Sequence, residues 1–240
     1  MPGRRIIGYS AVLLPHTDVG EVDWLGFESL LGLTIAAGLI PAVNMDTGYV
    51  QLLTEPDRAR VLTTAASLAG AGGFAAGAFV PDTEGDGYDP AAYSRAAAEV
   101  AEVGGTPVVF PSWGLASLSE EGWVDAQASL GAELDRFIAF ELGDMFVPYG
   151  RIYSLGVVPR VARHSQLHRR QAQLCPARPS DRLALRNEVR ADFSVFPATT
   201  GDRHGVLRLG LLGWACRRFA PDAFAERHRR WAAEERRSRS

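Results

Sequence analysis

The sequence predicts an α/β fold, a (β/α)8 barrel of the TIM type that is incomplete or distorted after its fifth strand. Apolar runs alternate with helix-like segments between residues 6 and 142, at intervals of roughly 30 residues, as in βαβ units. The runs are apolar throughout, which indicates strands buried on both faces. An open doubly wound sheet also fits this pattern. We favour the barrel because no GxGxxG follows the first run and no GxxxxGK[ST] occurs.

The expected elements follow one another in regular order. Aliphatic and β-branched runs predict strands, and apolar residues at helical spacing predict helices. Two segments are typical helix starts: Thr54 followed by Glu55 and Pro56, and Ser119 followed by two glutamates. The predicted strands cover residues 6–14, 41–45, 73–80, 106–110 and 136–142, and the helices cover 24–38, 54–68, 90–103 and 119–134.

The uncharged window from Val61 to Pro81 is long enough to cross a bilayer. It contains four glycines and is rich in Ala, Thr and Ser, so a helix, a glycine turn and a buried strand explain it better. The N-terminus lacks the apolar stretch of a secretion signal, and Cys175 and Cys216 form no CxxC pair. We therefore expect a cytoplasmic protein without a membrane span.

Charge divides the 240-residue chain into two parts. Residues 1–150 hold 6 of the 25 basic and 20 of the 28 acidic residues, a net charge of −14, whereas the remainder carries +11. All 25 basic residues are arginine, and the chain has no lysine. We expect a single barrel domain over 1–240, with regular βα repeats over 1–149, an irregular Arg-rich region over 150–218, and a C-terminal helix and tail over 219–240.

Residues 150–178 show no pattern for a fifth helix or a sixth strand. A barrel that stops there leaves the first and fifth strands with unpaired edges, which favour aggregation. The sequence therefore predicts poor solubility.

A polar cluster follows the second strand, at the end of the barrel where small ligands bind. It runs from Asn44 to Tyr49 and includes Asp46, Thr47 and Gly48. Position alone leaves open an anion-binding loop and an ordinary Asx turn. Glu141, at the end of the fifth strand, is a candidate general base or a partner for an arginine.

Other polar clusters are weaker candidates. The segment after the first strand predicts a solvated acidic loop rather than a cation site; it contains His16, Asp18, Glu21 and Asp23. The segment over residues 82–87 predicts a flexible exposed turn. His164 and His168 lack the HExxH pattern of a zinc site. We expect no metal.

Residues 38–54, GLIPAVNMDTGYVQLLT, resemble the second strand and loop of the dihydrodipicolinate synthase / N-acetylneuraminate lyase family, which reads Gly-Thr-Thr-Gly-Glu there. The opening VLLPH, with Asp18, Gly20 and Asp23, resembles its first strand and loop. The resemblance covers residues 6–142. It implies a barrel that needs no cofactor and forms a Schiff base between a lysine on strand six and a 2-oxo acid such as pyruvate.

The resemblance also implies roles for single residues. Thr47 and Gly48 match the residues that hold the substrate carboxylate. Asp46 stands where the family has a hydroxyl of its proton relay, and Phe140 stands at the catalytic tyrosine. Because phenylalanine has no acidic proton, acid–base work would fall to Glu141 or to a water.

The missing lysine conflicts with the family reaction. A Schiff base forms only on a primary amine, and a guanidinium stays protonated and is a poor nucleophile. Arg163, in the segment VARHS, resembles the family's Gly-x-Lys strand with the amine lost. The leading hypothesis is therefore a lyase or aldolase lineage that is inactive as written.

A related hypothesis is that the Arg-rich region is read out of frame. Residues 168–174 can be encoded so that a one-nucleotide shift gives Thr-Gly-Ala-Lys-His-Ser-Ser, with lysine over Gln171 and Ala172. Residues 202–213 can likewise be shifted into a strand-like eighth segment.

Two other functions stay open. The barrel can bind a small carboxylate without catalysis, through Thr47 and an arginine. The basic C-terminus can act as a nucleic-acid-binding arm, although it has few aromatic residues and no known motif. The sequence leaves a homo-oligomer open.

Overall fold

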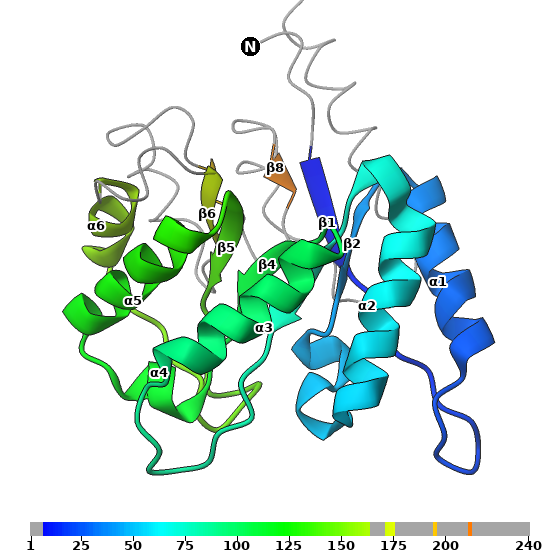
Figure 1. The fold of residues 1–240 in the computed structure, drawn as a ribbon, viewed down its shortest axis with the longest axis horizontal. Coiled ribbons are helices and arrows are strands. Elements are labelled where there is room, and N and C mark those ends of the chain that lie inside the picture. Colours follow the sequence, from blue (N-terminus) through cyan, green and yellow to red (C-terminus); the bar gives the residue numbers. More distant parts are fainter. Residues whose placement is uncertain (1–6, 164–170, 176–193, 196–210, 213–240) are drawn as a thin grey trace, which may run out of the picture.

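The structure is a computed structural model, and it describes residues 7–163, 171–175, 194–195 and 211–212. Its strands form one sheet in the order β7-β6-β5-β4-β3-β2-β1-β8 (Figure 1). The strands are β1 (Ile7–Ala11), β2 (Ile40–Val43), β3 (Ala75–Ala78), β4 (Thr106–Val109), β5 (Arg136–Phe140), β6 (Gln171–Cys175), β7 (Ser194–Val195) and β8 (Leu211–Leu212). The helices are α1 (Trp24–Ala36), α2 (Glu55–Ala69), α3 (Pro90–Glu102), α4 (Trp113–Ser117), α5 (Glu120–Glu133) and α6 (Val157–Arg163).

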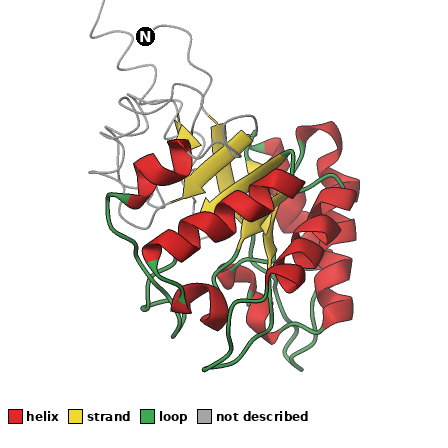
Figure 2. Cartoon of the chain, turned by 60° about the vertical axis from the view of Figure 1, so that its left-hand side comes forward, coloured by secondary structure: helices red, strands yellow, loops and turns green. Residues whose placement is uncertain are grey.

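The predicted parallel barrel is confirmed in its incomplete form. Each pair of neighbouring strands is parallel, and helices follow the first five strands. Figure 2 shows the helices gathered against the sheet. β7 and β8 end the sheet, and within the described residues no pairing joins them. The molecule is therefore a partial (β/α)8 barrel.

Side-chain caps start the long helices where the sequence predicts. The Thr54 hydroxyl accepts a hydrogen bond from the Asp57 amide at 3.3 Å, and Ser119 accepts one from Gly122 at 3.1 Å. Asp23 caps α1 in the same way. Each cap satisfies one of the amides that a helix leaves unpaired at its first turn.

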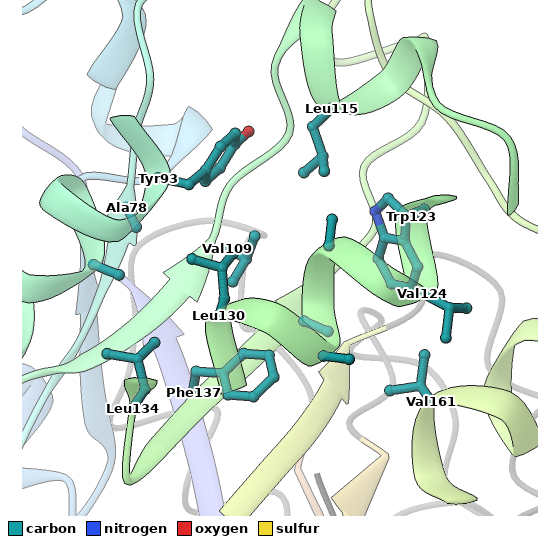
Figure 3. Close-up of a cluster of buried hydrophobic side chains, with 14 of the residues drawn as sticks. Ala78, Tyr93, Val109, Leu115, Trp123, Val124, Leu130, Leu134, Phe137 and Val161 are labelled. Atoms are coloured by element: carbon teal, nitrogen blue, oxygen red, sulfur yellow. The ribbon is translucent and has the colours of Figure 1, made fainter. Parts of the chain in front are cut away.

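Alternation along the strands separates an inner core from two outer clusters. Ile138 and Phe140 of β5 lie in the inner core, whereas Phe137 and Ala139 pack outward against the helices. Successive residues of a strand face opposite sides, so each strand serves both layers. Figure 3 shows one outer cluster, to which α5 contributes Trp123, β5 contributes Phe137 and α6 contributes Val161.

The expectation that residues 150–178 lack a helix and a strand is wrong. Val157 and Val161 of α6 are fully buried in the outer cluster that also contains α5 residues. The Ser154 amide and hydroxyl both donate to the Glu120 carboxylate, at 2.6 Å each. A helix of seven residues spans fewer than two full turns, too little for a periodicity signal.

The predicted bare edges are also wrong, because β5 pairs with β6 and β1 pairs with β8. The interpretation of the uncharged window as helix, glycine turn and strand is confirmed by α2, the 3-10 turn Gly70–Gly72 and β3. No helix in the described ranges is long and apolar enough to cross a membrane. His164, His168 and the expected helix and tail over 219–240 lie outside the described residues.

Candidate functional site

The loop after β2 turns sharply at the carboxyl end of the sheet. Asn44 and Tyr49 adopt left-handed backbone conformations, with φ of 50° and 55°. Between them, Asp46–Gly48 forms a single 3-10 turn. A Cβ added to Gly77 of β3 would lie 2.1 Å from the Asn44 carbonyl oxygen. The turn therefore fits only because the neighbouring strand has a glycine at this point.

The amides of this turn are used within the turn. Gly48 donates to the Met45 carbonyl and Tyr49 donates to the Asp46 carbonyl, both at 3.0 Å. The amides of Thr47 and of Asp46 itself lower the pKa of the Asp46 carboxyl. The Gly48 amide, on one of the two residues that the resemblance assigns to a substrate carboxylate, is thus already paired within this chain.

Burial raises the pKa of the Asp46 carboxyl, and the two amides only partly offset this effect. A half-buried carboxylate loses hydration, and the two nearby amides do not fully replace it. The Asp46 side chain is therefore easier to protonate than an ordinary aspartate.

Thr47 presents an unused hydroxyl beside Asp46. Its Oγ1 is buried and has no hydrogen-bond partner among the described residues. Gly48 is buried, and a Cβ at its position would lie 3.6 Å from the Val12 carbonyl oxygen of the first strand's extension. A buried hydroxyl without a partner is costly unless a further group completes it.

Asn44 points away from the other residues of the predicted cluster. Its Nδ2 donates to the Arg58 carbonyl of α2 at 3.1 Å. Its side chain lines a cavity of about 550 Å³ between α2 and α3, together with Arg58 and Arg95. The structure thus groups Asp46, Thr47 and Gly48 at the barrel end and places Asn44 in the helical layer.

The inner wall next to the loop is aromatic and apolar. The rings of Phe110 and Phe140 stack with centroids 5.9 Å apart, and Phe79 meets Phe110 edge-on at 6.2 Å. Phe140 is buried in the inner core. Phe110 and Phe140 are 0% and 6% exposed, so this wall is packed core, and its side chains carry no proton to transfer.

A loop from the β5–α6 connection brings a tyrosine to this end of the barrel, which the sequence did not predict. Leu142 and Arg151 form an antiparallel bridge at its base. Val147 is buried in the inner core, and Tyr149 packs partly buried against the same core. The Tyr149 ring lies 5.4 Å from Trp113. Burial raises the pKa of its phenol, and the charges of Asp82 and Asp46 raise it further.

Asp82 anchors the turn that was expected to be flexible. Its carboxylate accepts hydrogen bonds from the amides of Trp113 and Gly114, both at 2.8 Å. Asp86 closes the turn by accepting from the Thr83 amide and hydroxyl. The loop is exposed as predicted, but Asp82 fixes it to the start of α4. No group of potential metal ligands occurs in the described part of the chain.

Glu141 faces away from the Asp46–Gly48 turn. It follows Phe140, which lies inside the barrel, and so points to the outer layer. Its carboxylate is buried and accepts a hydrogen bond from the Tyr153 amide at 3.1 Å. The Tyr153 ring packs on Trp123, with centroids 4.5 Å apart. The contact fixes the β5–α6 connection, and a catalytic role of Glu141 stays a prediction.

Solved structures show what this fold is similar to. A dihydrodipicolinate synthase from Thermotoga maritima is 16% identical, with a TM-score of 0.74, over 97% of this chain and 81% of that one. A dihydrodipicolinate synthase family protein from Coccidioides immitis is 14% identical, with a TM-score of 0.78, over 98% and 75%. The enzyme from Aquifex aeolicus is 18% identical, with a TM-score of 0.70, over 95% and 78%. The chain has the fold of dihydrodipicolinate synthase. No family profile and no curated protein matches its sequence.

The dihydrodipicolinate synthase fold locates the sixth strand of this chain. β6 pairs with β5 so that Gln173 lies opposite Ile138 and Cys175 opposite Phe140. The strand reads QAQLC and contains no lysine. Arg163 ends α6 and is exposed, so the comparison of its segment with a Gly-x-Lys strand is wrong.

Proposed function

We propose that this chain descends from lyases or aldolases that act on a 2-oxo acid, and that it binds such an acid without forming a Schiff base. The site is the turn Asp46–Gly48, and pyruvate is the simplest candidate ligand. A cytoplasmic location is part of the proposal. The observation that carries it is the absence of lysine from β6 and from the whole chain.

The buried Thr47 hydroxyl supports binding at this turn. It can donate to a carboxylate and so gain the partner that it lacks among the described residues. The chain thus retains a group suited to binding the acid.

The chemistry that follows binding is absent. Without a side-chain amine, the carbonyl carbon of the acid cannot be held as an iminium, and no electron sink forms for making or breaking a carbon–carbon bond. Arginine does not replace the amine because its guanidinium stays protonated. Binding without turnover is the expected behaviour.

Calorimetric titration with pyruvate tests the proposal on the full chain. We expect saturable binding, and we expect Thr47→Val to weaken it by about ten- to a hundredfold, the range for a hydrogen bond to a charged group. Thr63→Val is the matched control, because the Thr63 hydroxyl is exposed on α2 and bonds to the Arg60 carbonyl at 3.0 Å. Absence of saturable binding, or an equal loss in both variants, would contradict the proposal.

A further inference from the structure

The Asp46 carboxylate lies in the same turn that we propose binds the carboxylate of the 2-oxo acid. The Gly48 and Tyr49 amides donate to backbone carbonyls of the turn, and the Thr47 amide lowers the pKa of the Asp46 carboxyl only in part against burial. The Thr47 hydroxyl, on the residue that follows Asp46, is buried and has no hydrogen-bond partner among the described residues. A carboxylate ligand must therefore approach an acceptor of the same charge.

We propose that Asp46 is a built-in competitor of the ligand carboxylate, so that the acid binds together with one proton taken up at Asp46. This inference rests on the proposed function of the same turn. Two carboxylates that share one half-buried site do not both stay ionised, because each raises the pKa of the other. When Asp46 is protonated, its hydroxyl becomes a donor and the repulsion disappears.

Among the residues that the structure describes, no positive charge acts as a counter-ion to Asp46. The Arg58 guanidinium donates to the Leu53 carbonyl at 2.6 Å and lies over the Phe79 ring at 5.5 Å. Asp82 is held at the start of α4 and adds negative charge near Tyr149. The further groups that face this end of the barrel are the Tyr149 phenol, whose pKa is raised, and the exposed pair Tyr49 and His16, whose rings are 6.5 Å apart.

Burial provides the means for proton uptake at an accessible pH. The pKa of Asp46 is already raised in the free protein, and an adjacent ligand charge raises it further. The pKa of a fully hydrated aspartate would have to rise further than that of Asp46 before the carboxyl could be protonated at the same pH. The resemblance places a threonine at this position, and a hydroxyl carries no charge to compete.

The test is calorimetric titration of the full chain with pyruvate from about pH 5 to about pH 8, in buffers of different ionisation enthalpy. We expect uptake of close to one proton per ligand at the upper end of this range. The affinity should fall by up to about tenfold per pH unit there. The wild-type chain alone supplies this result, so it stands even if a variant fails to fold.

Asp46→Asn and Asp46→Thr remove the competing charge. We expect both variants to bind pyruvate more tightly than the wild type near pH 8, by about tenfold or more, without proton uptake. Asp18→Asn is the matched control, since Asp18 is an exposed acid of the neighbouring β1–α1 loop, and it should behave as the wild type.

The outcomes separate the two proposals. If neither the wild type nor the Asp46 variants bind pyruvate at any pH, the proposed function fails. If the wild type binds without taking up a proton, or if both Asp46 variants bind more weakly, Asp46 is not a competitor and this inference is overturned while the function stands.

Discussion

Gly77 shows how one missing side chain shapes the end of the barrel. The Asn44 carbonyl occupies the space that a Cβ at residue 77 would fill, at 2.1 Å. We expect Gly77→Ala to lower the free energy of unfolding by about 2 kcal/mol or more, because backbone atoms must move apart. Urea unfolding measures this loss.

Gly32 of α1 is the matched control for Gly77. A Cβ at Gly32 meets nothing within 4 Å, and the residue is exposed on a helix. Gly32→Ala should therefore stabilise the chain by up to about 1 kcal/mol, since alanine favours the helix. Equal effects of the two substitutions would show that the Asn44 contact is not a constraint.

Asp46 also links stability to pH. Its folded-state pKa is raised, so the stability that it contributes is complete below its unfolded pKa of about 4 and is lost as pH rises through the folded value. We expect Asp46→Asn to unfold at higher urea concentration than the wild type near pH 7, and this advantage to vanish near pH 4. A variant that is less stable at both pH values would contradict the burial argument.

At the scale of elements, α6 corrects the sequence-based expectation and can be tested directly. Val161 is fully buried in the outer cluster with α5 residues. Val161→Ala removes two methylene equivalents, so we expect it to cost about 2 kcal/mol in urea unfolding. Val19→Ala, at a position 82% exposed, should cost almost nothing. If both changes are neutral, α6 is not packed as described.

The sequence predicted the elements that carry a strong local signal. The five apolar strands and the four capped helices up to residue 142 depend on periodicity and on caps such as Thr54 and Ser119. α4 and α6 have only five and seven residues, too few for a period. β6 lacks β-branched residues, and its pairing with β5 shows only in three dimensions.

The part of the candidate site that has a local sequence signal was predictable, and the part that depends on long-range contacts was not. The turn Asp46–Gly48 was found because it follows a strand and resembles a family loop. The outward direction of Glu141 could have been inferred, since it follows Phe140 by one residue in a strand. Tyr149 was missed because its approach to Asp46 depends on a loop folded back across the barrel end, a long-range contact without a local signal.

At the scale of the whole molecule, the chain keeps the dihydrodipicolinate synthase fold, while its last 90 residues hold 19 of the 25 arginines and no lysine. The frame-shift hypothesis places a lysine over Gln171 and Ala172, which begin β6 opposite Arg136 and Phe137. Sequencing the gene tests this hypothesis, and an uninterrupted frame without error would remove it. The nucleic-acid-binding alternative depends on residues mostly outside the described ranges.

The central claim is that this chain binds a 2-oxo acid and cannot hold it covalently. Borohydride reduction in the presence of pyruvate, followed by mass spectrometry of the peptides, tests it most directly, with a lysine-dependent aldolase as positive control. We expect the control to gain the mass of a reduced adduct and every internal peptide of this chain to keep its mass. An adduct on an internal residue would contradict the account.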